Sequence, residues 1–314
     1  MREPSAALAA DPGQWHFSAL LGEPGQGALT QPAFGETGES MSKDTNTGRR
    51  DFLLTGAALG AAAAVAPLGA TQAQAQTGGF VIPTPEATTL PVVGSSQRFP
   101  VRRIYCVGRN YLEHIRELGN DERQPPFFFA KHRDMIVQNG STVFYPGLTQ
   151  DYQHELELVV AMKSGGENIP REQALSHVYG YAIGLDMTRR DLQTASRQKE
   201  QPWEIGKSFE QCAPCSAVTP LERLGGKHLT EGKIQLAVNG KTRQDGDLNL
   251  MIWDVPDIIR HLSTQVGLAA GDLIYTGTPA GVAAVVAGDK MVGTIAGLGE
   301  LSITITPART ARAG

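Results

Sequence analysis

The chain has 314 residues, of which 41% are hydrophobic and 19% charged, so it can bury the core of one or two globular domains. Its formal net charge is −4 and no stretch is dense in lysine or arginine, which excludes a basic surface for nucleic acid. Three cysteines are too few for a disulfide framework. The pair Cys212 and Cys215 could form a redox CxxC motif, but Pro214 between them favours a structural role.

The N-terminal quarter of the sequence is typical of a leader. Residues 1–40 show no hydrophobic periodicity and are interpreted as a non-native or disordered extension. In 41–75, Arg49 and Arg50 precede an apolar, alanine-rich run that ends in the small-residue sequence AQA, the order of a twin-arginine signal peptide. A buried alanine-rich helix is the alternative, and the glycines and proline of the run disfavour a permanent membrane span. The sequence therefore predicts export or a periplasmic location, and a cytoplasmic one if the leader is not used.

Beyond the leader, the pattern predicts a linker or edge segment at 76–100, a catalytic body at 101–308 and a tail at 309–314. Helices are expected at 170–178 and 255–266, where apolar residues fall at helical spacing. No GxGxxG sequence follows a strand, so a dinucleotide-binding fold has no support. Short β-rich runs dominate the body and predict strands at 103–108, 141–146, 155–162, 181–188, 233–240 and 272–282.

Two glutamates stand two residues apart in the run DYQHELELVV. In a strand, Glu155 and Glu157 would share one face, while Leu156 and Leu158 would point to the other. A solvated strand face explains such a pair by itself. However, Asp186 ends the apolar run YGYAIGLD, where a buried strand needs a reason to carry a charge. Three carboxylates without clustered cysteine or histidine predict a site for a hard divalent cation, Mg²⁺ or Mn²⁺ before Zn²⁺.

A histidine and a glutamate stand three residues apart in NYLEHIREL. A short helix would place His114 and Glu117 on one side, so that the carboxylate holds one imidazole nitrogen and the other takes a proton from water. A surface ion pair is the alternative for such a spacing. Beside three predicted metal ligands, the pair is interpreted as an acid–base dyad. His154 would point away from the ligands and is expected to be structural or to support them.

Several segments resemble, in order along the chain, those of the fumarylacetoacetate hydrolase family: YCVGRNYLEHIREL, PPFFFAK, HELELVV, GYAIGLDMTRRDLQ, PWEIGKSF and GDLIYTGTPAGV. PPFFFAK and MTRRDLQ are most similar to the branch that hydrolyses fumarylpyruvate in the gentisate pathway. The resemblance implies an α+β fold, a mixed β-rich roll with short peripheral helices, that forms a homodimer. It also implies Mg²⁺ or Mn²⁺ on Glu155, Glu157 and Asp186, and cleavage of C–C bonds in β-diketo acids.

The resemblance also implies roles for individual side chains. His114 and Glu117 become the acid–base dyad, and Lys207 in GKSF becomes a further catalytic residue. Lys131 closes a run of three phenylalanines, where a lysine either reaches solvent past apolar surface or clamps an anion, and the family favours the clamp. Arg189 is expected to be exposed. The predicted substrate-binding residues are Arg109, Lys131, Arg190, Gln193 and Thr278.

Two departures from the family pattern bear on the substrate. Where relatives commonly have Lys-Pro, this chain has Lys131 followed by His132 and Arg133, which removes a rigid turn and adds positive charge. Relatives are cytoplasmic as a rule, so a copy with an export leader could serve another diacid. The metal site is unaffected by either departure, whereas the specificity is left open.

The predicted reaction is hydrolysis of a 3-acylpyruvate, with fumarylpyruvate giving fumarate and pyruvate. His114 takes a proton from a water that attacks the distal ketone, and pyruvate leaves as its enolate. Oxaloacetate decarboxylation and dienoate isomerisation are alternatives on the same scaffold, because they need the same enolate but no attacking water. An exported diacid-binding protein without chemistry is the alternative from another class, and it would be expected to lack the dyad.

Overall fold

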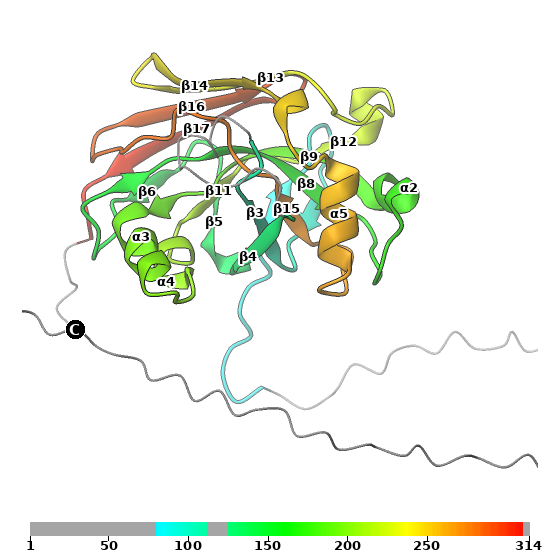
Figure 1. Ribbon diagram of the computed structural model, residues 1–314, viewed down its shortest axis with the longest axis horizontal. Helices are drawn as coiled ribbons and strands as arrows, with labels where there is room; N and C mark the ends of the chain where they lie inside the picture. Colours follow the sequence, from blue (N-terminus) through cyan, green and yellow to red (C-terminus); the bar gives the residue numbers. More distant parts are fainter. Residues whose placement is uncertain (1–79, 112–124, 310–314) are drawn as a thin grey trace, which may run out of the picture. The chain divides into compact units, whose positions relative to one another are not determined.

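The computed structural model describes residues 80–111 and 125–309 (Figure 1). The extension at 1–40, the twin-arginine leader at 41–75 and nearly all of the tail at 309–314 lie outside these residues. Those three assignments stay predictions. Within the described ranges, no helix combines the length and hydropathy that a bilayer crossing requires.

The first of two main sheets is mixed and carries most of the strands that lead to the site (Figure 1). Its order is β4-β3-β15-β8-β9-β11-β5, and β12 pairs with β9. The pairs β3–β15 and β5–β11 are parallel, and the other pairs are antiparallel. Its strands are β3 (Ile104–Gly108), β4 (Phe127–Lys131), β5 (Ile136–Gln138), β8 (Leu156–Met162), β9 (Val178–Leu185), β11 (Ala213–Cys215), β12 (Thr219–Pro220) and β15 (Leu273–Tyr275).

The second sheet lies over the first as a separate layer (Figure 1). It has the order β14-β13-β16-β17-β6, in which only β17 and β6 run parallel. Its strands are β6 (Thr142–Phe144), β13 (Lys233–Val238), β14 (Lys241–Asp247), β16 (Lys290–Ile295) and β17 (Gly299–Thr306). Two short pairs complete the strands of the described residues: β1 (Thr89–Pro91) with β2 (Arg98–Pro100), and β7 (Tyr152–Gln153) with β10 (Thr188–Arg189).

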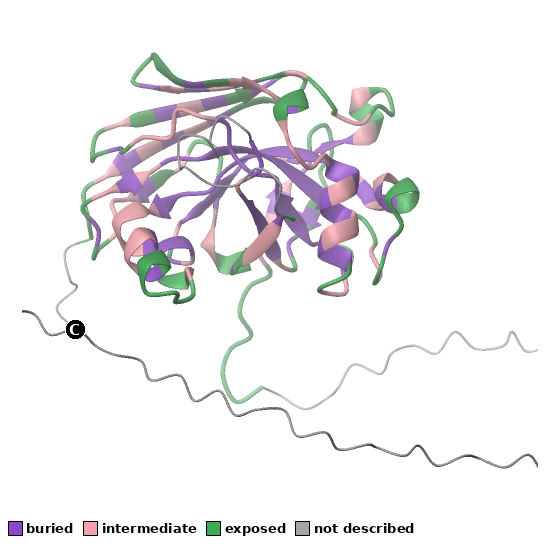
Figure 2. Ribbon diagram, in the orientation of Figure 1, coloured by how far each residue is buried: buried purple, intermediate pink, exposed green. Residues whose placement is uncertain are grey.

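Strand β8 is buried along its whole length (Figure 2). Its two faces pack in different places. Leu156, Leu158 and Val160 belong to the main core, which also contains side chains of β13, β16 and β17. Val159 and Ala161 point the other way, into a smaller cluster that includes Leu90 and Phe99 of the β1–β2 hairpin. The alternation expected for this strand is therefore present.

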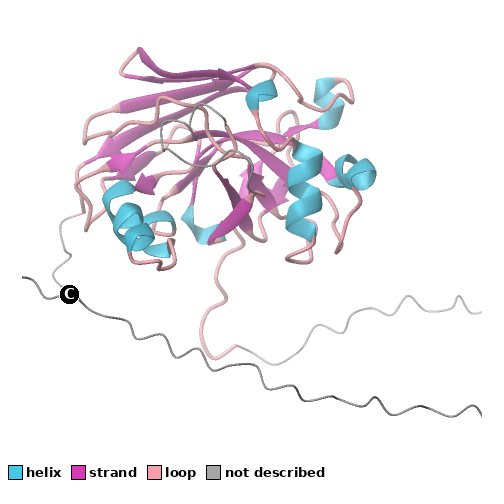
Figure 3. Cartoon of the chain, in the orientation of Figure 1, coloured by secondary structure: helices cyan, strands magenta, loops and turns pink. Residues whose placement is uncertain are grey.

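Helices are few and short, and they lie at the periphery of the sheets (Figure 3). Asp254 caps α5 by accepting a hydrogen bond from Asp257 N at 2.9 Å, and the helix buries Ile258, Ile259 and Leu262. The helix predicted at 255–266 is therefore present, but it ends at Ser263. The helices are α2 (Arg171–Ala174), α3 (Arg190–Gln198), α4 (Glu204–Lys207) and α5 (Val255–Ser263), with 3₁₀ turns at Arg133–Met135, Leu175–His177, Leu221–Leu224 and Leu248–Leu250.

These elements confirm the predicted mixed, sheet-rich fold with short peripheral helices. The helix expected at 170–178 is one turn of α2 followed by a 3₁₀ turn. The segment at 76–100, predicted as a linker or edge segment, contains the β1–β2 hairpin, whose Leu90 and Phe99 pack in the smaller cluster. Cys212 and Cys215 are buried free thiols, and burial raises the pKa of Cys215 to about 12, which fits a structural role.

Candidate active site

Three carboxylates meet where β8 begins and β9 ends. Glu155 directly precedes β8, Glu157 is its second residue, and Asp186 directly follows β9. The antiparallel register continues past the strand ends, because Asp186 N donates to Glu155 O at 2.8 Å. Each carboxylate offers an oxygen within 4.8 Å of the others, and the three residues are 5%, 1% and 1% exposed. The solvated-face alternative is therefore wrong for this strand.

These residues fit a hard divalent cation. Oxygen is the ligand atom that Mg²⁺ and Mn²⁺ prefer, and three buried carboxylates supply it without sulfur or imidazole. Burial raises the pKa of Glu157 well above its usual range, and the charges of Asp186 and Glu155 add to the shift. A hydrogen bond from Gly277 N and the charge of Lys207 oppose it. A cation entering the site would take the place of the proton that this shift favours.

Lys207 spans two of the three carboxylates. Its Nζ lies 2.6 Å from Glu155 Oε2, 2.8 Å from Asp186 Oδ2 and 2.7 Å from Thr188 Oγ1. An ammonium group has three protons, so all its donors are used. Lys207 sits at the end of the short helix α4, and its side chain is 3% exposed. The structure thus places this predicted catalytic residue against the carboxylates themselves.

Lys131 approaches Asp186 from the last position of β4. Its Nζ lies 2.8 Å from Asp186 Oδ1 and 3.2 Å from Met187 O, and it also donates to Lys207 O. Burial by itself would lower the pKa of Lys131, but the charge of Asp186, its hydrogen bond to the ammonium and smaller contributions from Cys212 and Cys106 together raise it. The side chain is fully buried. Its ammonium therefore contacts a carboxylate of the site, whereas the sequence predicted a clamp on the substrate.

Arg190 and Gln193 lie one turn apart on α3 and act together. Arg190 donates to Glu155 Oε1, to Gln153 Oε1 at 2.8 Å and to Gln193 Oε1 at 2.5 Å. Because a guanidinium group cannot accept a hydrogen bond, the Gln193 oxygen must face Arg190. The Gln193 amide nitrogen is then left to donate, and Gln193 lines the cavity described below.

Gly277 and Asn110 fix the turn that closes the site above Glu157. Gly277 N donates to Glu157 Oε2 at 2.8 Å from a left-handed backbone with φ of +94°. A Cβ atom at Gly277 would lie 2.7 Å from Asn110 Cβ. Asn110 is fully buried, and its Nδ2 donates to Thr276 O at 2.7 Å. Gly277 is therefore required both by its left-handed backbone and by the lack of room for a Cβ atom.

Gln244 is a supporting residue that the sequence analysis missed. Its Nε2 donates to Thr278 Oγ1 at 2.8 Å, and its Oε1 accepts from Leu156 N at 3.0 Å. His154 Nδ1 lies 3.1 Å from the same Oε1, so it carries the proton, and burial lowers the pKa of His154. Gln244 thus fixes the strand of the ligands from β14, and His154 is structural. Nothing local in VNGKTRQDG signals this contact, which joins residues far apart in the sequence.

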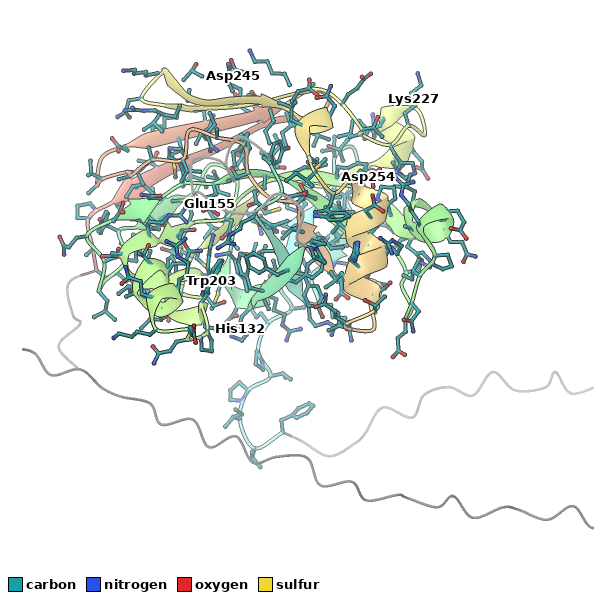
Figure 4. All side chains as sticks on the ribbon, viewed as in Figure 1. His132, Glu155, Trp203, Lys227, Asp245 and Asp254 are labelled. Atoms are coloured by element: carbon teal, nitrogen blue, oxygen red, sulfur yellow. The ribbon has the colours of Figure 1, made fainter. Side chains whose placement is uncertain are left out.

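A cavity of about 590 Å³, including its open mouth, adjoins the carboxylates. Glu155 and Trp203 mark it in Figure 4, with Glu155 among the strands and Trp203 nearer to α4. Thr278 lines it, but its hydroxyl proton goes to Leu156 O at 2.8 Å, so the hydroxyl is committed before any substrate binds. The described lining residues are Val107, Gly108, Arg109, Phe129, Glu155, Glu157, Asp186, Arg190, Gln193, Thr194, Arg197, Trp203, Lys207 and Thr278.

The structure brings together most of the residues predicted for the site. Arg109, Arg190, Gln193, Lys207 and Thr278 line the same cavity as the three carboxylates, and Lys131 forms an ion pair with Asp186. His114 and Glu117 lie outside the described residues, so the dyad stays a prediction. The expectation for Arg189 is wrong. This residue is half-buried, with its guanidinium carbon 4.2 Å from the centre of the Phe209 ring.

The charge balance of the site is compatible with a divalent cation and an anionic substrate. Glu155 and Asp186 contact three cations, Lys131, Lys207 and Arg190, whereas Glu157 forms no ion pair with these three. Formal charge therefore cancels when all three carboxylates are ionised. A divalent cation would make the site positive, and Arg109 and Arg197 at the cavity add to this. The arrangement is suited to a substrate with more than one negative charge.

Known proteins share both the sequence and the fold. The family model for the C-terminal region of fumarylacetoacetate (FAA) hydrolase matches residues 103–306. A fumarylpyruvate hydrolase of Ralstonia sp is 47% identical over 182 residues, which are 58% of this chain and 93% of that protein. A mitochondrial oxaloacetate tautomerase of Homo sapiens is 38% identical over 204 residues, which are 65% of this chain and 91% of that protein.

Among solved structures, the fumarylpyruvate hydrolase of Pseudomonas aeruginosa in complex with Mn²⁺ and pyruvate matches with a TM-score of 0.71 and 47% identity. The match covers 73% of this chain and all of that one. The family model alone spans more than half of the chain, and it includes the three carboxylates, Lys131 and Lys207. This chain belongs to the fumarylacetoacetate hydrolase family.

Proposed function

We propose that this protein is a divalent-metal-dependent hydrolase of 3-acylpyruvates, with fumarylpyruvate as its substrate and fumarate and pyruvate as its products. The observation that carries the proposal is the buried cluster of Glu155, Glu157 and Asp186 at the base of a cavity lined by arginines. The similarity to the enzyme from Ralstonia and to the Mn²⁺ and pyruvate complex supports the choice of substrate.

Glu155, Glu157 and Asp186 would hold Mg²⁺ or Mn²⁺. When bound, the cation supplies a Lewis acid for the oxygens of an α-keto acid and for the negative charge that develops on them. The buried position of the three ligands keeps bulk water from screening that charge.

Side chains of the cavity would orient the substrate and stabilise its charge. Arg190 fixes the orientation of the Gln193 amide, and no hydrogen bond from the amide nitrogen is formed among the described residues, so this nitrogen can donate to a substrate oxygen. Lys207 holds Glu155 and Asp186 in place and adds positive charge beside them. These contacts hold the acidic residues in one geometry before the substrate arrives, so little reorganisation is needed during the reaction.

In the proposed reaction, His114 takes a proton from water, and Glu117 orients the imidazole. The oxygen of that water adds to the distal ketone carbon, whose bond to the neighbouring methylene carbon then breaks. The ketone carbon leaves as the new carboxylate of fumarate. The methylene carbon keeps the electron pair and takes the proton that His114 received, which gives pyruvate. The new carboxyl group releases the second proton of the water to solvent, so atoms and charges balance.

The test uses the purified protein with fumarylpyruvate, after EDTA treatment and after Mn²⁺ or Mg²⁺ is restored. We expect hydrolysis with the metal and none after chelation. His114→Ala should bind Mn²⁺ as the wild type does, while kcat falls by about 10²–10⁴-fold. Wild-type kcat in His114→Ala would contradict the role of this residue, and no hydrolysis by the metal-loaded wild type would contradict the proposed function.

Tautomerisation of oxaloacetate is a second candidate, favoured by the 38% identity to the human tautomerase. That reaction moves a proton and breaks no C–C bond, so it needs the same carboxylates but no attacking water. Comparison of kcat/KM for fumarylpyruvate and oxaloacetate in one preparation decides between them. We expect the ratio to favour fumarylpyruvate, and a ratio that favours oxaloacetate would support the second candidate.

We also propose that the protein is an exported homodimer, on the sequence of the leader and on the family resemblance. Light scattering of the purified protein tests the dimer. Cell fractionation of the wild type and of the double variant Arg49→Lys with Arg50→Lys tests the export. Equal retention of both forms in the cytoplasm would contradict export by this leader.

A further inference from the structure

One face of helix α3 runs from the carboxylates to the mouth of the cavity. Arg190, Gln193, Thr194 and Arg197 all line the cavity, at the spacing of neighbours on one helix face. Arg190 is tied to Glu155, and Arg197 stands seven residues later, about 10 Å along the helix axis. Arg197 is exposed, which agrees with a place at the open end.

Arg109 provides a second guanidinium group at this end. It follows β3 directly, with a left-handed backbone (φ of +61°), and its guanidinium carbon lies 5.6 Å from the centre of the Phe127 ring. Arg109 and Arg197 both line the cavity, and burial lowers the pKa of Arg109, with the charge of Arg197 lowering it further by repulsion. Both stay protonated at neutral pH, as arginine does in proteins.

These two arginines differ from the other cations of the cavity. Arg190 and Lys207 are paired with carboxylates of the site. By contrast, no carboxylate among the described residues forms an ion pair or hydrogen bond with Arg109 or Arg197. Two like charges that have no carboxylate partner among these residues favour the binding of an anion.

An aromatic wall stands beside the arginine pair. The Trp203 ring meets Phe127 edge-on, with ring centres 5.1 Å apart, and lies 6.1 Å from Phe129. A second, outer pocket shares Arg109, Phe129 and Trp203 with the cavity. Glu204 lines that outer pocket but is exposed. A flat, unsaturated carbon chain could lie along these rings, with its charged end at the arginines.

We propose that Arg109 and Arg197 form a subsite for the distal carboxylate of a dianionic substrate, with Phe129 and Trp203 against the carbon chain. This inference rests on the proposed function and deepens it, because it assigns the residues that select diacids over monoacids. With a divalent cation held by Glu155, Glu157 and Asp186, the α-keto acid end would bind there, and the arginine pair holds the other end. Fumarylpyruvate has a carboxylate at each end, whereas acetylpyruvate lacks the distal one.

The test compares fumarylpyruvate and acetylpyruvate as substrates for Arg109→Gln, Arg197→Gln and the double variant, all loaded with Mn²⁺. A hydrogen bond to a charged group corresponds to a change of about 10- to 100-fold, so each single variant should lose that much kcat/KM for fumarylpyruvate. Values for acetylpyruvate should stay within about threefold, because no distal charge is lost. Lys199→Gln is the matched control, since this exposed lysine at the end of α3 does not line the cavity.

Equal losses for the two substrates would overturn the inference, as would unchanged kcat/KM for fumarylpyruvate in the double variant. If the wild type hydrolyses neither fumarylpyruvate nor acetylpyruvate, the proposed function is wrong, and the subsite is tested by binding instead. The two compounds then serve as ligands in calorimetry with the Mn²⁺-loaded protein. Tighter binding of fumarylpyruvate that is lost in Arg197→Gln but kept in Lys199→Gln would support the subsite, and equal binding in all forms would overturn it.

Discussion

Gly277 N donates a hydrogen bond of 2.8 Å to Glu157 Oε2, and it can do so because Gly277 adopts a φ of +94° that other residues rarely adopt. A buried carboxylate between two like charges is stabilised by such a donor. The turn TGTPAGV is therefore part of the site through its backbone, and the effect of a side chain at Gly277 can be predicted.

Gly277→Ala should destabilise the protein by more than about 1 kcal/mol and weaken Mn²⁺ binding, because the new Cβ would lie 2.7 Å from Asn110 Cβ. Gly240→Ala is the control. Gly240 also has a positive φ, of +77°, but nothing lies within 4 Å of its Cβ position. Chemical denaturation and calorimetry measure both variants. Equal losses of stability and unchanged Mn²⁺ affinity in Gly277→Ala would contradict this account.

Metal-free protein should lose stability as the pH rises through the pKa of Glu157. The folded state raises that pKa above its value in the unfolded chain, so the protonated carboxyl stabilises the fold at low pH and this contribution is lost at high pH. Melting temperatures in EDTA, measured at pH values below and above the pKa of Glu157, should fall more steeply with pH for the wild type than for Glu157→Gln, which cannot titrate. Mn²⁺ should remove the difference in slope, because it replaces the proton. Parallel curves in EDTA would show that Glu157 does not titrate in this way.

Lys207→Met should lower the free energy of unfolding of the metal-free protein by about 3 kcal/mol, because it leaves Glu155 and Asp186 without the ammonium between them. Mn²⁺ should stabilise this variant by more than it stabilises the wild type, since the cation restores the lost positive charge. Lys199→Met, at an exposed lysine, is the control and should change little. The account fails if Lys207→Met is as stable as the wild type in EDTA.

The three carboxylates could be predicted from the sequence because each has a strong local signal. Glu155 and Glu157 follow the two-residue period of a strand, and Asp186 ends an apolar run that becomes β9. The sheet-rich class and the helix α5 were predicted for the same reason, since periodicity and capping act within a few residues.

Other parts of the site depend on contacts between distant segments. Gln244 reaches Leu156 and Thr278 from another sheet, and Lys131 contacts Asp186 across the first one. A local sequence pattern predicts neither the contacts of Gln244 nor the contact of Lys131 with Asp186. Helix α3 was missed because its exposed positions are polar, although its spacing places Arg190 and Arg197 on one face.

Glu157→Gln gives the most direct test of a divalent metal centre at these carboxylates. Among the described residues Glu157 accepts a hydrogen bond from Gly277 N alone, and an amide oxygen can accept the same bond, so the fold should be kept. The measurement is calorimetric Mn²⁺ titration of the wild type and the variant, followed by fumarylpyruvate assays on the same samples. We predict Mn²⁺ binding at least about 100-fold weaker, with hydrolysis lost and metal-free stability equal to or above that of the wild type. Wild-type Mn²⁺ affinity together with wild-type hydrolysis in Glu157→Gln would contradict the account.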